Sequence, residues 1–193
     1  DFEKGGTHWK TTDVKDKFWK ITEVEGNRVF RVTGQSDYRP PHRSPRSIAF
    51  IKDIVVGDFE LTVKVQSTNT KAGGHRDMCL FLGYQNPARF YYVHLGQKAD
   101  PHACQIFIVN DAARTKITTQ GVSGIPWDEA WHNVKVIRRI SDGTMEVYFD
   151  DMTKPVMKAK DKTFTWGQVG LGTFDDHGNW DDFELRGVKV SRK

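Results

Sequence analysis

Cysteine is scarce in this sequence, and neither a long apolar run nor a concentrated run of one charge occurs. The two cysteines, Cys79 and Cys104, can form one disulfide or stay unpaired as small buried residues, and the sequence leaves both alternatives open. No apolar run approaches the ~20 residues of a membrane-spanning helix, and the N-terminus lacks the regions of a signal peptide. We expect a mature or trimmed chain with no membrane span.

A basic excess is present but small and dispersed. The sequence has 29 Lys and Arg against 25 Asp and Glu, which gives a net charge of +4. Nucleic-acid binding favours a concentrated basic stripe, which this distribution does not provide. We therefore expect no nucleic-acid partner, whereas an anionic sugar chain remains compatible with the charge.

Apolar and polar residues alternate along many short segments, and no segment keeps the period of a long helix. The clearest alternation runs over residues 59–66, and Gly-containing turns at 25–27 and 141–143 predict hairpins. About twelve short strands without intervening helices require antiparallel pairing. The sequence therefore predicts an all-β sandwich of two packed sheets, with residues 1–193 forming a single domain and a monomer.

Four segments in the second half of the chain carry a family pattern. Residues 131–138 (WHNVKVIR) and 143–150 (GTMEVYFD) resemble paired strands of laminin-G-like and concanavalin A-like lectin and glucanase domains, and residues 167–172 and 179–185 resemble their closing strands. The resemblance implies a jelly roll of two curved antiparallel sheets with carbohydrate on the concave face. The Glu-x-Asp-x-x-Glu strand of the retaining glucanases is missing, so their paired-carboxylate mechanism is not expected.

Ionisable residues alternate with apolar ones between positions 75 and 111. Tyr92 and His94 alternate with Tyr91 and Val93, and Asp77 begins a similar segment. Successive side chains of a strand point to opposite faces, so one set can fill a core while the other lines a surface. We expect Asp77, Tyr92 and His94 to lie in the concave groove.

These residue types are suited to β-elimination on a uronate glycan. The reaction needs a base, an acid and a group that neutralises the carboxylate, which we assign to His94, Tyr92 and either Arg76 or Arg43. The further catalytic candidates are His75 and Asp77, and the further substrate-binding candidates are His102, Lys98, Gln105 and Trp180. The alternatives are a structural role for His94, a local Arg76–Asp77 ion pair and a loop role for His102.

Two kinds of metal site are also compatible with the sequence. Ligation of a transition metal by His75, Asp77, His94 and His102 is chemically reasonable, although their spacing matches no compact motif.

Calcium is the second kind. Asp181 shares strand parity with Phe183 and Leu185, so its carboxylate is expected on the packed side, where a cation would offset the cost of an unpaired charge. The family resemblance implies that Glu3 and Gly26 complete this calcium site. The alternative is that backbone amides bind the Asp181 carboxylate.

The sequence as a whole favours a secreted or periplasmic protein that acts on a polysaccharide or oligosaccharide, with a lyase slightly favoured over pure binding. One alternative is a non-catalytic carbohydrate-binding module that uses aromatic platforms such as Trp127, Trp166 and Trp180. The others are a glycoside hydrolase of non-classical mechanism and a laminin-G-like protein-interaction domain. Whether the protein is an enzyme stays open at this point, because one fold serves all of these functions.

Overall fold

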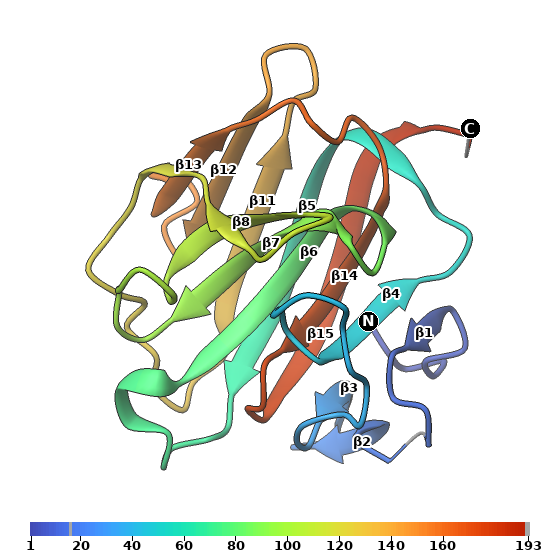
Figure 1. The fold of residues 1–193 in the computed structure, drawn as a ribbon. Helices are drawn as coiled ribbons and strands as arrows, with labels where there is room; N and C mark the ends of the chain where they lie inside the picture. The colour runs from blue at the N-terminus through green and yellow to red at the C-terminus, as the bar shows by residue number, and fades with distance from the viewer. Residues whose placement is uncertain (16, 192–193) are drawn as a thin grey trace.

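Two antiparallel sheets make up the computed structural model, which describes residues 1–15 and 17–191 (Figure 1). In spatial order, the seven-stranded sheet contains β1 (Trp9–Thr11), β4 (Ser47–Ile51), β14 (Gln168–Thr173), β6 (Asp77–Asn86), β7 (Arg89–Gly96), β8 (Gln105–Asn110) and β9 (Thr115–Lys116). The eight-stranded sheet contains β10 (Thr118–Gln120), β13 (Met157–Lys160), β12 (Thr144–Phe149), β11 (His132–Arg138), β5 (Val56–Ser67), β15 (Gly178–Lys189), β3 (Asn27–Val32) and β2 (Trp19–Val24). Among the described residues, the 3-10 turn η1 (Gly73–His75) is the sole helical element. The predicted all-β sandwich is confirmed.

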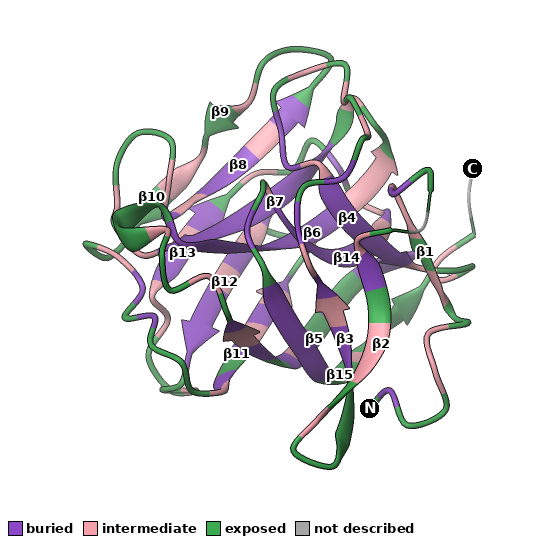
Figure 2. Ribbon diagram, turned by 90° about the horizontal axis from the view of Figure 1, so that it is seen from below, coloured by how far each residue is buried: buried purple, intermediate pink, exposed green. Residues whose placement is uncertain are grey.

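The main core lies between the two sheets. Strand β5 contributes Phe59, Leu61, Val63 and Val65, all buried, while the alternate residues of the strand are more exposed. Strands β6 and β7 of the opposite sheet contribute buried apolar side chains to the same core. Figure 2 shows buried residues along the central strands of both sheets, among them β5, β6 and β7. Period-2 alternation therefore produces the sandwich as expected.

A second hydrophobic cluster covers the other face of the seven-stranded sheet, which we call the outer face. Its buried members are Ile48, Phe50, Cys79, Phe81, Phe90, Tyr92, Phe107 and Val109, and Tyr84 and Phe174 pack against them. The central strands of this sheet are consequently buried on both faces. For this reason β4, with the sequence SIAFI, is buried along most of its length and shows no alternation that would have predicted it.

Hydrogen bonds join the two ends of the segment between β3 and β4. The Ser47 hydroxyl donates a hydrogen bond to the Gly34 carbonyl at 2.8 Å and accepts one from the Ser36 amide at 2.8 Å. Arg43, in the proline-rich part of this segment, lies beside Phe174 in a shared cavity wall. In Figure 1 the segment passes in front of the sheet. It thus forms one wall of a cavity on the outer face.

Within the described residues, no helix is long and apolar enough to cross a bilayer. Both cysteines lie in the described part of the chain, where they are buried and unpaired.

Candidate functional site

Strand register places the predicted groove residues on the outer face. Tyr91 and Val93 belong to the core between the sheets, whereas Tyr92 lies in the outer-face cluster, as the alternation predicts. His94 follows two residues later on β7 and is paired in register with Cys79 of β6. Asp77 lies two residues before Cys79 and therefore shares its face.

A cavity of about 400 Å³ opens on this face. It is lined by Arg43, His75, Asp77, His94, Asp100, His102, Ala103, Arg114, Phe174 and Asp175. Five of the lining residues were site candidates from the sequence: Arg43, His75, Asp77, His94 and His102. They come from the segment between β3 and β4, from η1, from β6 and β7, and from the loop after β7. The cavity therefore combines cationic, imidazole and carboxylate groups from segments that are far apart in the sequence.

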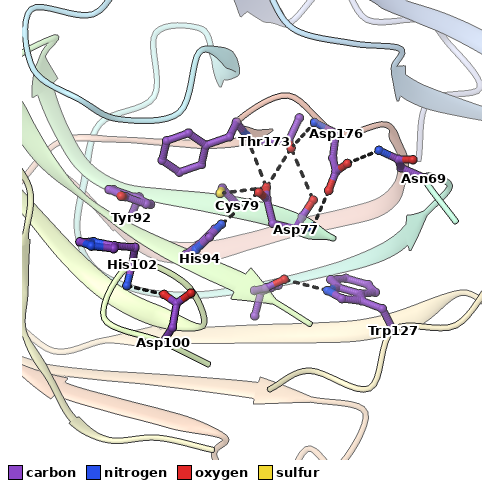
Figure 3. A network of polar contacts seen from close by, with 12 residues as sticks. Asn69, Asp77, Cys79, Tyr92, His94, Asp100, His102, Trp127, Thr173 and Asp176 are labelled. Carbon is purple, nitrogen blue, oxygen red and sulfur yellow. Dashed lines mark hydrogen bonds and ion pairs between the residues drawn. The ribbon is translucent and has the colours of Figure 1, made fainter. Parts of the chain in front are cut away.

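Asp77 is the most highly connected residue of the cavity floor (Figure 3). Its Oδ1 atom accepts hydrogen bonds from the Thr173 hydroxyl at 2.9 Å and the Phe174 amide at 3.4 Å. Its own amide donates to Asp176 Oδ2 at 2.6 Å, and Asn69 donates to the other oxygen of Asp176. Burial raises the pKa of Asp176 to about 6. This network fixes the Asp77 carboxylate in one orientation.

His94 lies next to that carboxylate. Its Nε2 atom is 3.1 Å from Asp77 Oδ2, and both side chains are almost completely buried. The contact is close, but the ring N–H is not aligned for a regular hydrogen bond, and neither ring nitrogen has an aligned partner among residues 1–15 and 17–191. The Phe174 ring packs edge-on against the imidazole at 5.4 Å between centroids. His94 is therefore a buried polar group with the Asp77 carboxylate and the Cys79 thiol close by.

Tyr92 lies below the cavity surface and is fully buried. Arg114 donates a hydrogen bond to its hydroxyl at 2.6 Å, and the Arg114 guanidinium stacks over the rings of Phe107 and Phe174 at 4.7 and 4.9 Å. Burial raises the pKa of Tyr92 well above its ordinary value. The Tyr92 hydroxyl thus holds Arg114 in place. Arg114 lines the cavity, whereas Tyr92 does not.

Three other candidates lie away from the cavity. The Arg76 guanidinium donates to the Ser67 hydroxyl at 2.8 Å, to the Ser67 carbonyl at 2.7 Å and to backbone carbonyls at 127 and 128, because its parity is opposite to that of Asp77. The expected roles of Arg76 as carboxylate clamp and as Asp77's ion-pair partner are therefore wrong. Lys98 is exposed beside η1, and Gln105 donates to the Asp100 carbonyl at 3.1 Å.

Trp180 is also misplaced by sequence reasoning. Its side chain is fully buried in the core between the sheets, where no substrate can reach it. The expectation that Trp180 binds substrate is wrong, because strand β15 turns this ring toward the core.

The residues of the expected calcium site come together at the other end of the molecule. Asn27 donates to Asp181 Oδ2 at 2.6 Å, and the neighbouring Arg28 amide donates to the Glu3 carboxylate at 2.9 Å. Gly26 occupies the tight turn of this hairpin, at φ 81°. Asp181 is buried, and its Oδ1 atom has no hydrogen-bond partner within the described parts of the chain. A buried carboxylate oxygen without a donor fits a cation ligand.

Arg114, Asp100, Phe174 and Asp175 were missed by sequence reasoning. Each lies in a loop or at a strand end, where no periodicity marks a side chain as facing the site. Asp100 binds the His102 amide at 2.6 Å, which lowers the pKa of its carboxyl and fixes the loop after β7. The Asp100-Pro101 pair was a turn signal, but it did not indicate which surface the turn would face.

Comparison with known structures identifies the fold as the concanavalin A-like jelly-roll sandwich. The chain is similar to the carbohydrate-binding module CBM66 from Bacillus subtilis, with a TM-score of 0.65 and 17% identity over 94% of this chain and 96% of that one. It is also similar to a mutant of the GH43 protein BlXynB from Bacillus licheniformis, with a TM-score of 0.61 and 11% identity over 95% of this chain and 37% of that one. A basic winged bean lectin gives a TM-score of 0.55 and 13% identity over 94% of both chains.

Neither a protein-family model nor a curated protein sequence matches the chain. The structural similarities, all at low identity, therefore define the fold, and the function has to be argued from the site.

Proposed function

We propose that the protein binds an anionic, uronate-containing polysaccharide on the outer face of the seven-stranded sheet, with one sugar carboxylate in the cavity. The observation that carries this proposal is the convergence of Arg43 and Arg114 on one cavity that three histidines also line. Guanidinium groups bind carboxylates through paired, charge-assisted hydrogen bonds. A carbohydrate-binding module and a lectin share the fold, which supports a sugar ligand.

Binding assays with matched polysaccharides test this function. We expect alginate or polygalacturonate to bind more tightly than a neutral glucan, with an affinity that falls as salt rises. Arg43→Ala should weaken binding of the anionic chain about tenfold, the effect of losing one charge-assisted hydrogen bond of about 1.5 kcal/mol. Arg186, an exposed arginine on β15 that pairs with Glu184, provides the matched control. Equal affinity for neutral and anionic chains, or equal effects of both substitutions, would refute the proposal.

β-Elimination is the second candidate function, and the Asp77–His94 pair at the cavity floor favours it. In this reaction His94 removes the C5 proton, the electron pair forms the C4–C5 double bond, and the C4–O bond breaks. An arginine neutralises the carboxylate, and His75 or His102, which line the cavity, protonates the leaving oxygen. This assignment moves the acid role away from Tyr92, since that hydroxyl is buried against Arg114.

Product analysis distinguishes the activities. A lyase produces an unsaturated uronate that absorbs in the ultraviolet, whereas a hydrolase produces new reducing ends without this absorbance. A binding module produces neither signal from any polysaccharide that it binds.

We also propose a structural calcium ion at Asp181. Hard cations such as calcium take carboxylate and backbone carbonyl oxygens as ligands. Asp181 Oδ1, together with backbone oxygens near Glu3 and Gly26, provides ligands of this kind, and the unpartnered Oδ1 atom supports the proposal. The ion would attach the start of β15 to the N-terminal segment. An extracellular polysaccharide as ligand further implies a secreted or periplasmic location.

A further inference from the structure

We propose that Asp77, Cys79 and His94 form a binding site for a borderline-soft divalent transition metal, zinc in particular, at the floor of the cavity. One carboxylate oxygen, one thiol sulfur and one imidazole nitrogen from these residues all lie within 4.8 Å of one another. All three side chains are buried. Carboxylate, thiolate and imidazole are the ligand types that zinc takes in proteins.

The three ligands are arranged by the sheet itself. Asp77 and Cys79 are two residues apart on β6 and point to the same face, and His94 on β7 is the register partner of Cys79. Two neighbouring strands in the middle of a sheet, covered on both faces, hold side chains more rigidly than loops do. A metal site of this kind is pre-formed by β-pairing and needs no loop closure.

The distances are close to those that a tetrahedral zinc ion requires. Zinc bonds of ~2.0–2.3 Å place neighbouring ligand atoms about 3.3–3.7 Å apart. Here the distance from Cys79 Sγ to Asp77 Oδ1 is 3.9 Å, and that from His94 Nε2 to Asp77 Oδ2 is 3.1 Å. These two distances are to different oxygens of Asp77, and one ligand atom from each of the three residues lies within 4.8 Å of the others. Side-chain rotations would bring the three atoms closer around one ion.

The polar groups around the cluster also indicate an occupant. His94 is buried, yet neither of its ring nitrogens has an aligned hydrogen bond within the described residues. Asp77 Oδ1 is held by Thr173 and by the Phe174 amide, which leaves Oδ2 directed toward the imidazole. Ligating carboxylates are commonly oriented by hydrogen bonds of this kind. The arrangement provides ordered ligand atoms and an unsatisfied imidazole at one point.

The cavity wall above the cluster carries charges of both signs. Three carboxylates, from Asp77, Asp100 and Asp175, face two guanidinium groups, from Arg43 and Arg114. Zinc takes cysteine as the thiolate, so binding of the ion would displace the thiol proton of Cys79. The cavity above the cluster provides room for a fourth ligand, either water or an oxygen of a bound molecule.

This inference is independent of polysaccharide binding, because it rests on the three side chains alone. It does bear on the role of His94. An imidazole nitrogen that coordinates a metal cannot remove a proton, so a zinc-loaded protein would use the metal to bind a carboxylate and would leave proton abstraction to His75 or His102.

Metal binding can be measured directly on the full chain. After metals have been removed with a strong chelator and zinc has been added back, we expect one equivalent of zinc per chain to be retained through desalting, as measured by elemental analysis. Cobalt(II) should give a near-ultraviolet thiolate-to-cobalt charge-transfer band and the intense visible bands of a tetrahedral site. Both metals should raise the melting temperature, because they bind the native state.

Cys104 provides the matched control, since it is a second buried cysteine outside the cluster. Cys79→Ala should abolish the charge-transfer band and zinc retention, and Cys104→Ala should preserve both. His94→Gln provides a second ligand variant in case Cys79→Ala folds poorly. Zinc retention below one equivalent in the wild-type chain, or a cobalt band that survives Cys79→Ala in folded protein, would overturn the proposal. Polysaccharide affinity of the metal-free protein reports separately on the proposed function.

Discussion

His94 Nε2 lies 3.1 Å from Asp77 Oδ2 because β6 and β7 pair with Cys79 opposite His94. The contact is therefore a diagonal one between neighbouring strands, and it is fixed by the backbone ladder rather than by a loop. The same ladder sends Tyr91 and Val93 to the core between the sheets. A disturbance of this pair would consequently act on the site and on the core together.

Replacement of His94 tests the catalytic proposal. If His94 is the base, His94→Ala should reduce turnover on a uronate polysaccharide by at least ~100-fold, the usual effect of losing a positioned base. Initial rates followed by ultraviolet absorbance provide the measurement. His177→Ala changes an exposed histidine outside the cavity lining and should leave the rate unchanged. Unchanged turnover in His94→Ala would exclude this base while leaving the binding site intact.

Calcium removal tests the proposed site at Asp181. Chelation with EDTA should lower the melting temperature of the wild-type chain, because a ligand of the native state stabilises it by mass action. Asp181→Ala should remove the difference between chelated and calcium-loaded samples, as measured by differential scanning calorimetry. Calcium added back after chelation should restore the wild-type transition and have no effect on the variant. A wild-type transition that does not respond to EDTA would refute the site.

The Tyr91 hydroxyl provides a test of the core. It accepts a hydrogen bond from the Phe164 amide at 2.9 Å and donates one to the Asp161 carboxylate. Tyr91→Phe should lower the free energy of unfolding by about 1–3 kcal/mol, because it leaves a buried amide without a partner. Tyr148→Phe provides the control, since that hydroxyl donates to Glu146 near the surface at 3.0 Å, and its loss should cost less. Denaturant titration measures the loss in the free energy of unfolding for both variants. Equal losses would contradict the buried role of the Tyr91 hydroxyl.

The same residue predicts a pH dependence. The pKa of Tyr91 is raised from 10.0 to about 12. Burial of the hydroxyl is the largest cause, and the hydrogen bond to Asp161 is the second. The folded chain therefore keeps the proton over a range in which the unfolded chain loses it. The stability that the protonated Tyr91 hydroxyl contributes to the folded state is fully present below pH 10 and is lost as the pH rises toward 12. The stability difference between wild type and Tyr91→Phe should narrow over this range in unfolding titrations, and a constant difference would contradict the assignment.

The regular part of the structure could be predicted from sequence because alternation is a local property. It identified most strands and the outward face of Tyr92 and His94. Strand β4 was not predicted, because a strand that is buried on both faces shows no alternation of polar and apolar residues. Arg114 and Phe174 were not predicted as site residues. Long-range packing brings their loops to the cavity, and the local sequence does not indicate that packing.

Alternation also fails where a strand is irregular. A bulge interrupts β15 between Asp181 and Glu184, and Asp182 adopts a positive φ of 46°. The parity that linked Asp181 to Phe183 therefore does not carry across the bulge. Asp181 is nevertheless buried, and its position beside Asn27 depends on the hairpin rather than on strand parity.

The division of β6 and β7 into a core face and a site face limits how this protein could have diversified. Insertion of one residue into either strand would move the core-facing side chains to the cavity face and the cavity-facing side chains to the core. The core and the cavity therefore both constrain the length of these strands. Segments 35–46, 97–104, 111–114 and 174–176 carry the remaining lining residues except His75, and they are free of that double constraint. Relatives with other ligand preferences should therefore keep the strands in length and vary in these four segments, which makes the segments natural targets for grafting a new specificity.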